Sequence, residues 1–203
     1  MPNWTTNTLR FAGTPEQMAP IIDATTFASG TQKASFSFDK ILPIPQELVA
    51  TRSPLKIDPE QNAPTLTQTF AGVTEIVSIN PEENLRRLRL YGANNWYNWS
   101  VTNWGTKWDA VRTEVLSHTP GSADSPTILV LRFDTAWTAP HRLIGHLRSL
   151  GVEIIGGAIY EDGDQFEDLS ENPEDFEEHF VVRSEVETED EYAWRMIEMR
   201  NAD

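Results

Sequence analysis

The chain has 203 residues, of which 39% are hydrophobic and 10% aromatic, enough to build the core of one sizeable domain. It contains no cysteine, which excludes disulfides, thiolate metal sites and cysteine nucleophiles. Residues 1–150 hold 13 Lys and Arg against 13 Asp and Glu, whereas residues 151–203 hold 3 against 18, so the net charge of −15 lies entirely in the last quarter of the chain.

The N-terminal part predicts a strand followed by a helix. The strand covers Asn7–Phe11. Thr14 and Gln17 then form the capping-box pattern of a helix start, with Pro15 at the first helical position. Pro20 lacks a backbone N–H, so we expect a late start or a kink in this helix.

The next segment predicts a half-buried strand and an insertion. Phe36 and Phe38 alternate with serines within Ala34–Asp39, which is typical of a strand with one buried face. Residues 46–79 are interrupted by prolines and diluted by Thr and Gln, and we interpret them as an insertion that wraps the surface.

The segment after the insertion predicts an amphipathic helix. It opens at Pro81, ends at Gly92 and places Leu85 and Leu88 on an inner stripe. Its arginines resemble a nucleic-acid patch, but two of them follow a glutamate by four residues, which predicts a salt-bridged outer face instead.

The following segment predicts two strands and a crossover. Asp109–Ser117 and Thr127–Phe133 are the strands, and the second contains the fully apolar run of a central strand. A helix over residues 138–150 leads to the strand Val152–Tyr160, whose two glycines indicate a bulge or a close approach. A crossover of this kind joins parallel strands, so we expect Thr127–Phe133 and Val152–Tyr160 to run parallel.

Together these elements predict an α+β fold with helices packed on one face of a sheet. The residues expected to be buried are Leu9, Phe11, Ile22, Phe36, Phe38, Leu129, Leu131, Leu143, Leu147, Ile154 and Ile155.

No segment predicts export or a membrane span. Residues 1–30 show neither a basic start nor an apolar run, so we expect no signal peptide. The longest apolar stretches, such as Ile128–Leu131, are far too short to cross a bilayer. We therefore expect a cytoplasmic protein with no membrane partner.

Four of the seven tryptophans lie in one short run, at Trp96, Trp99, Trp104 and Trp108. Their spacing fits neither a strand nor a single helical face, and neighbouring asparagines offer partners for the indole N–H groups. Two interpretations follow. The run is either a turn-rich aromatic sub-core or a stacking pocket for a base, a sugar or a partner's side chain.

Candidate catalytic and metal-binding groups are few. His141 and His146 are five residues apart on the predicted helix, so they do not form a zinc pair. The acidic run 161–164 suits a hard cation but lacks the spacing of a calcium loop. Asp109 and Asp134 follow aromatic residues at strand boundaries, where a carboxylate either caps the chain or takes part in catalysis. We expect no metal and no cofactor.

Several motifs occur in a fixed order along the chain. They are Met1–Trp4 with Asn7, Phe38–Pro45 with Glu47–Leu48, Tyr91–Ala93, Trp96, Trp99, Asn103–Asp109 and Phe133–Trp137. This series resembles the YubB-like ferredoxin-like domain family of phage and conjugative-plasmid proteins. Thr5 departs from the pattern, because relatives often have a cysteine there.

The resemblance implies a ferredoxin-like domain over residues 1–165, and the sequence pattern adds to it the insertion 46–92. We expect an acidic C-terminal extension, 166–203, that packs partly on this body. The family has no established reaction, so the resemblance implies a setting, the cytoplasm of a bacterial host, rather than an activity.

We expect a non-enzymatic accessory protein of a mobile genetic element that binds a host-encoded or element-encoded protein, with counter-defence inhibition as one such role. The alternative is a small hydrolase or nucleotide-binding enzyme with a pocket built on Trp96–Asp109. The candidate ligand- or partner-binding residues are Trp4, Trp96, Trp99, Asn103, Trp104, Lys107, Trp108, Asp109 and Trp137.

The acidic segment is a second predicted partner surface. Its carboxylates repel nucleic acid and attract basic protein surfaces, so we expect no direct nucleic-acid binding through it. Phe166, Leu169, Phe176 and Phe180 interrupt the segment, which predicts that part of it packs on the body. The alternative is a tail that only keeps the protein soluble. The acidic residues expected to face a partner are Glu161, Asp162, Asp164, Glu174, Asp175, Glu177 and Glu178.

Overall fold

The computed structural model describes residues 3–27, 33–51, 65–70, 73–78, 81–160 and 165–171. The chain divides into two compact units. Residues 43–103 form one unit, and the flanking residues 1–42 and 104–203 form the other. No helix in the described ranges is long and apolar enough to cross a membrane.

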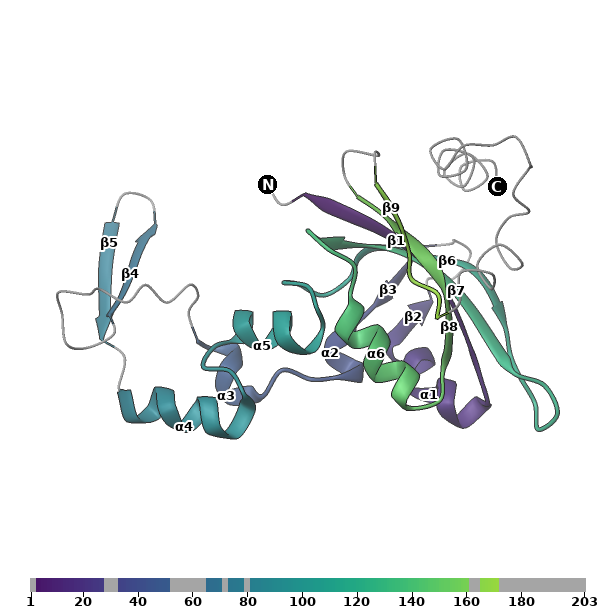
Figure 1. The fold of residues 1–203 in the computed structure, drawn as a ribbon, viewed down its shortest axis with the longest axis horizontal. Coiled ribbons are helices and arrows are strands. Elements are labelled where there is room, and N and C mark those ends of the chain that lie inside the picture. Colours follow the sequence, from purple (N-terminus) through teal and green to yellow (C-terminus); the bar gives the residue numbers. More distant parts are fainter. Residues whose placement is uncertain are drawn as a thin grey trace. The chain divides into compact units, whose positions relative to one another are not determined.

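The larger unit is built on a five-stranded antiparallel sheet with the order β6-β7-β1-β8-β9 (Figure 1). Its strands are β1 (Trp4–Gly13), β6 (Val111–Thr119), β7 (Thr127–Ala136), β8 (Glu153–Ile159) and β9 (Phe166–Asp168). β1 pairs antiparallel with both β7 and β8, so these two run parallel with β1 between them, as predicted. Helix α6 (His141–Ser149) makes the crossover, and the α+β fold is confirmed.

Helix α1 (Pro15–Ala24) follows β1 and starts with the predicted capping box. The Thr14 hydroxyl accepts a hydrogen bond from the Gln17 N–H, and the Gln17 side chain accepts one from the Thr14 N–H. The helix begins at Pro15 and continues through Pro20 to its end. Pro20 lies on the exposed side, where water can bond the carbonyl that the proline leaves unpaired.

Aromatic rings fill the core beneath one face of the sheet. The ring centroids of Phe36 lie 6.0 Å from Phe11 and 5.4 Å from Phe133. Phe38 meets both Phe36 and Phe133 edge-on, the geometry that ring quadrupoles favour. α1 and α6 lie on this same side of the sheet (Figure 1).

Of the predicted core residues, only Ile22 is not buried. The buried residues of α1 are Met18, Ile21 and Ala24, which leaves Ile22 half-buried at the edge of this stripe. The others are buried as predicted: Leu9, Phe11, Phe36, Phe38, Leu129, Leu131, Leu143, Leu147, Ile154 and Ile155.

The predicted strand Ala34–Asp39 is wrong in its second half. Strand β3 (Ala34–Phe36) pairs with β2 (Thr25–Phe27), and the short helix α2 (Phe38–Ile41) follows directly. The Asp109 carboxylate accepts a hydrogen bond from the Phe38 N–H at the start of α2. This distant cap turns the chain, and the local alternation of serine and phenylalanine does not reveal it.

The described parts of the second unit form a hairpin and three helices. They are α3 (Gln46–Val49), the antiparallel pair β4 (Thr65–Phe70) and β5 (Val73–Ser78), α4 (Pro81–Tyr91) and α5 (Trp96–Asn103). One of the two interpretations of the tryptophan run was a turn-rich sub-core, but the first part of the run is helical. The cap of α5 is Asn95, whose side-chain oxygen accepts a hydrogen bond from the Asn98 N–H at 2.9 Å.

Ion pairs cover one side of α4, as predicted. Glu83 pairs with Arg86 at 2.8 Å and with Arg87 at 3.1 Å, and Arg86 also pairs with Glu47 of α3. The hydrogen bond from Arg86 lowers the pKa of the Glu83 carboxyl, and the same bond raises the pKa of Arg86. Arg86 and Arg87 therefore form ion pairs on the surface of the helix, as the spacing of the glutamates in the sequence predicts.

Candidate functional site

The loop from Trp104 to Ala110 is held to the larger unit at several points. The Trp104 indole is buried edge-on against Phe38, and its N–H donates to the Leu42 carbonyl at 2.9 Å. The buried Thr106 hydroxyl donates to the Ala136 carbonyl at 2.8 Å. Gly105 has φ +89° and approaches α6 so closely that a Cβ would lie 3.0 Å from the backbone nitrogen of His141. Only glycine fits this contact without strain.

Asp109 is the last anchor of this loop. One carboxylate oxygen accepts from the Phe38 N–H at 2.6 Å and the Ala110 N–H at 2.9 Å, and the other accepts from the Ser37 hydroxyl at 2.8 Å. Three donors thus bind the carboxylate, so Asp109 caps the chain in this structure. With Thr106 and Asp109 fixed, the anchors leave Lys107 and Trp108 half-buried at the surface between them.

A buried polar network shapes the turn after β7, which carries Trp137. The Asn7 amide donates to the Thr135 hydroxyl at 2.9 Å, and that hydroxyl donates to the Thr138 carbonyl at 2.7 Å. The Trp137 N–H donates to the Asn3 carbonyl at 2.8 Å. These bonds fix both ends of the turn and hold Trp137 beside the start of β1.

The two anchored segments, together with Trp4 of β1 and Arg112 of β6, bring three tryptophans and two cations into one continuous stack. The guanidinium carbon of Arg112 lies 4.6 Å from the ring centroid of Trp4, and the Trp4 and Trp108 centroids are 6.2 Å apart. The Lys107 ammonium lies 4.4 Å from the Trp108 centroid and 4.9 Å from the Trp137 centroid. We call these five residues the indole ladder. Its cation–ring distances are within the range of attractive cation–π contacts.

Two members of the indole ladder have backbone conformations that L-residues rarely adopt. Arg112 has φ +51° and Trp137 has φ +71°, and they are the non-glycine residues with positive φ in the described ranges. Such a conformation persists only where the surroundings enforce it, and it concentrates at functional sites. Trp137 is nevertheless 45% exposed, so its strained backbone presents a large ring to solvent.

The indole ladder includes Trp4, Lys107, Trp108 and Trp137 from the predicted set. Arg112 was not predicted, and no sequence signal marks it, because its place depends on the irregular register of β6 against β7. Its guanidinium pairs with Asp134, one of the two carboxylates considered for catalysis.

Of the predicted tryptophans outside the indole ladder, Trp104 is buried in the larger unit, and Trp96 and Trp99 belong to the second unit. Trp99 is buried on α5, and Trp96 is half-buried at its start. The Asn103 amide donates to the Trp99 carbonyl at 2.9 Å, within the same helix. Trp99 is therefore closed to a ligand in this structure, and the Asn103 amide is bonded within its own helix.

The acidic segment is described over residues 165–171, and this part is packed on the sheet. Leu169 is buried, and the Phe166 ring lies over Gly157, where a Cβ would come within 2.3 Å of it. The glycine predicted to allow a close approach thus seats this phenylalanine. The predicted acidic contacts Glu161, Asp162, Asp164, Glu174, Asp175, Glu177 and Glu178, with Phe176 and Phe180, lie outside the described residues.

Glu167 of β9 joins this segment to the end of β8 and to α6. Its carboxylate accepts a hydrogen bond from the Tyr160 hydroxyl at 2.6 Å and lies 3.4 Å from His141 Nε2. Burial, and then the hydrogen bond to Glu167, raise the pKa of the Tyr160 hydroxyl.

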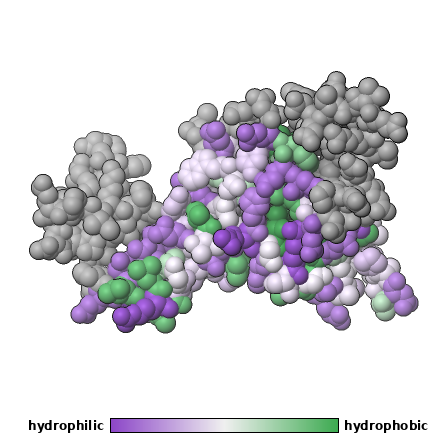
Figure 2. All heavy atoms as spheres, viewed as in Figure 1, coloured by the Kyte–Doolittle hydropathy of each residue, from purple (hydrophilic) through white to green (hydrophobic). Residues whose placement is uncertain are grey.

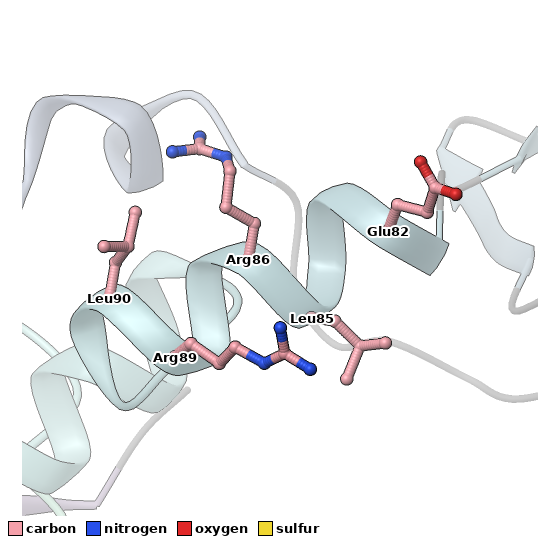
Figure 3. A pocket seen from close by; sticks show the side chains of 5 residues that line it. All are labelled: Glu82, Leu85, Arg86, Arg89 and Leu90. Atoms are coloured by element: carbon pink, nitrogen blue, oxygen red, sulfur yellow. The ribbon is translucent and has the colours of Figure 1, made fainter.

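A hollow of about 410 Å3 lies on α4, lined by Glu82, Leu85, Arg86, Arg89 and Leu90 (Figure 3). Figure 2 shows apolar side chains among polar ones where this helix lies. The prediction that Leu85 and Leu88 form a buried stripe is wrong, since they are 51% and 41% exposed.

Among the described residues, no three His, Asp or Glu side chains come together as a metal site would require. No family model matches the chain, and neither does any curated protein or solved structure.

Proposed function

We propose that the protein is a non-enzymatic binding protein that contacts a protein partner through its indole ladder. The observation that carries the proposal is the exposed Trp137 ring, held in a left-handed backbone conformation beside Lys107 and Trp108. Tryptophan and arginine dominate the binding energy of protein interfaces, and a rigid aromatic side chain loses little conformational entropy on binding.

A protein partner fits the charges of this sheet better than a nucleic acid does. Arg112 pairs with Asp134, Arg132 pairs with Glu114, and Arg10 pairs with Glu153 at 2.5 Å. Phosphate contacts need arginines that can release their partners, and each of these has a carboxylate in place. The acidic C-terminal segment adds a field that repels phosphate and attracts a basic surface.

The setting and the finer fold are part of the same proposal. Within the larger unit, β1, α1, β6, β7, α6 and β8 occur in the sequence order of a ferredoxin-like domain, with β2, β3 and α2 added between α1 and β6. The sheet order β6-β7-β1-β8 supports that assignment. The motif resemblance supports an accessory protein of a phage or plasmid, acting in the host cytoplasm. Inhibition of a host defence protein is the role that this setting favours.

Quantitative capture of a partner tests the proposal. The tagged full chain is cross-linked in host lysate, and captured proteins are compared with those of Trp137→Ala. We expect one protein to fall about tenfold or more with this variant, since interface tryptophans commonly contribute over 1.4 kcal/mol. Neutralising Glu174, Asp175, Glu177 and Glu178 together should also reduce capture at low salt.

Phe27→Ala is the matched control. Phe27 is 43% exposed, similar to Trp137, and it stacks on His118 at the opposite end of β6 from the indole ladder. Its removal should leave capture unchanged. Equal capture by the wild type and Trp137→Ala would contradict the proposal.

A further inference from the structure

We propose that Trp108 and Trp137 form a cage for a lysine or arginine side chain of the protein partner, and that Lys107 occupies this cage when the partner is absent. The inference rests on the proposed function, because it concerns how a protein partner would engage the indole ladder. It assigns the partner a chemistry, a basic surface, and it gives Lys107 the role of an internal occupant.

The geometry of the cage is already that of a cation site. The Lys107 ammonium lies 4.4 Å from one ring centroid and 4.9 Å from the other, so both rings contact the same charge. Indole is the strongest of the aromatic side chains in attracting cations. Trp137 lies in a turn and has a backbone φ of +71°, a conformation that the surrounding hydrogen bonds maintain. The second ring is therefore positioned by the fold rather than by the lysine.

The backbone on either side of Lys107 is fixed by groups other than its own side chain. The Thr106 hydroxyl and the Asp109 carboxylate fix the chain on either side of it, so the four-carbon stem can swing while the backbone stays in place. Arg112 remains on Trp4 with its charge paired to Asp134. Departure of the lysine therefore removes the ammonium that lies 4.4 Å and 4.9 Å from the two ring centroids.

The charge of the chain favours a cation as the incoming group. Residues 151–203 hold 18 Asp and Glu against 3 Lys and Arg, and β9 attaches the start of this stretch to the sheet that carries Trp4. Such a field raises the local concentration of basic surfaces and speeds their approach. One partner cation then replaces one internal cation, so the exchange leaves the net charge of the site unchanged.

The test titrates the full chain with tetramethylammonium, a cation that fits aromatic cages, and follows the indole N–H resonances, assigned with Trp137→Phe. Lys107→Ala should bind this probe about 2- to 30-fold more tightly than the wild type, the range expected for cation–π contacts. Adding Trp137→Ala should remove that gain. Lys40→Ala, which removes the same charge from the lysine bonded to the Asp23 carbonyl, should behave like the wild type.

Neutral tert-butanol separates charge from shape and should bind no better after Lys107→Ala than before. Thermal unfolding of every variant checks the fold, and Lys107→Gln gives a second reading if Lys107→Ala is unstable. Equal affinity of the wild type and Lys107→Ala for the cation, or a gain that persists without Trp137, would overturn the cage. If capture of a partner still depends on Trp137 in that case, the cage fails while the proposed function stands.

Discussion

The larger unit contains two aromatic regions that obey different physical rules. In the core, Phe11, Phe36, Phe38 and Phe133 contact one another ring to ring, and the polar atom of Trp104 is satisfied by a backbone carbonyl. In the indole ladder, rings contact cations, and Trp137 is 45% exposed.

The difference teaches which tryptophans stabilise the fold and which are available to a partner. A ring that is buried and bonded contributes through the apolar area it removes from water. A ring that is held in place but left open contributes little to stability, because much of its surface remains hydrated. Stability and binding should therefore respond to different substitutions.

The largest effect is expected from the core. Trp104→Ala should lower the free energy of unfolding by about 3–5 kcal/mol, because it leaves a cavity and an unpaired Leu42 carbonyl. Trp137→Ala should lower it by less than about 1 kcal/mol. Urea denaturation followed by far-UV circular dichroism measures both, and similar losses in the two variants would remove the distinction between the regions.

The second largest effect is expected at Asp109, which bonds the start of α2 in the aromatic core and follows Trp108 of the indole ladder. Asp109→Ala should lower the free energy of unfolding by about 2 kcal/mol, because the three donors that share this carboxylate lose their acceptor. Asp124→Ala, at an exposed loop position, is the control and should change it by under about 0.5 kcal/mol. A loss no greater than that of the control would show that the carboxylate is dispensable as an anchor.

A smaller effect isolates the strained backbone of the indole ladder. At position 137, Gly should be more stable than Ala by about 1 kcal/mol, because only glycine adopts a positive φ without steric cost. At position 108, where φ is not positive, the order should reverse. Comparing Gly with Ala at the same position by denaturation cancels the effect of losing the ring. If Ala were more stable than Gly at both positions, Trp137 would be unstrained.

The smallest effect lies outside both regions, at Tyr160. Its pKa is raised in the folded protein, so the neutral hydroxyl is favoured by folding. That stabilisation is complete below the ordinary value of about 10 and is lost as the pH rises through the higher folded value. Stability should fall above pH 10, and less steeply in Tyr160→Phe. Parallel slopes in thermal melts of both proteins would contradict the assignment.

The sequence predicted the elements that depend on local signals. The Thr14 capping box and the apolar run of β7 are properties of neighbouring residues, and the α-helical crossover makes β7 and β8 parallel whatever lies between them. The start of α2 could not be predicted, because its cap is a carboxylate 71 residues away along the chain. Helix α5 was missed because buried tryptophan and exposed polar residues do not follow one clear stripe.

The indole ladder could be predicted only as a set of residues. Trp4, Lys107, Trp108 and Trp137 were all candidates, but strand register brings them together, with Trp4 opposite Ala136 on the paired strand. The positive φ of Trp137 follows from the bonds of Thr135 and Asn3. Arg112 depends on a register shift in β6. Strand register, hydrogen bonds between distant residues and a register shift cannot be predicted from a short stretch of neighbouring residues.

The bond between Trp104 and Leu42 has a consequence for how this chain can vary. Leu42 is the last residue before the unit 43–103, and Trp104 is the first residue after it. A hydrogen bond of 2.9 Å therefore joins the two points of the larger unit between which residues 43–103 are inserted in the chain. Domains inserted between adjacent points of a host fold can be lengthened, exchanged or deleted while the host core stays intact. Joining Leu42 to Trp104 by a short glycine linker would make the larger unit a continuous scaffold onto which other modules can be grafted.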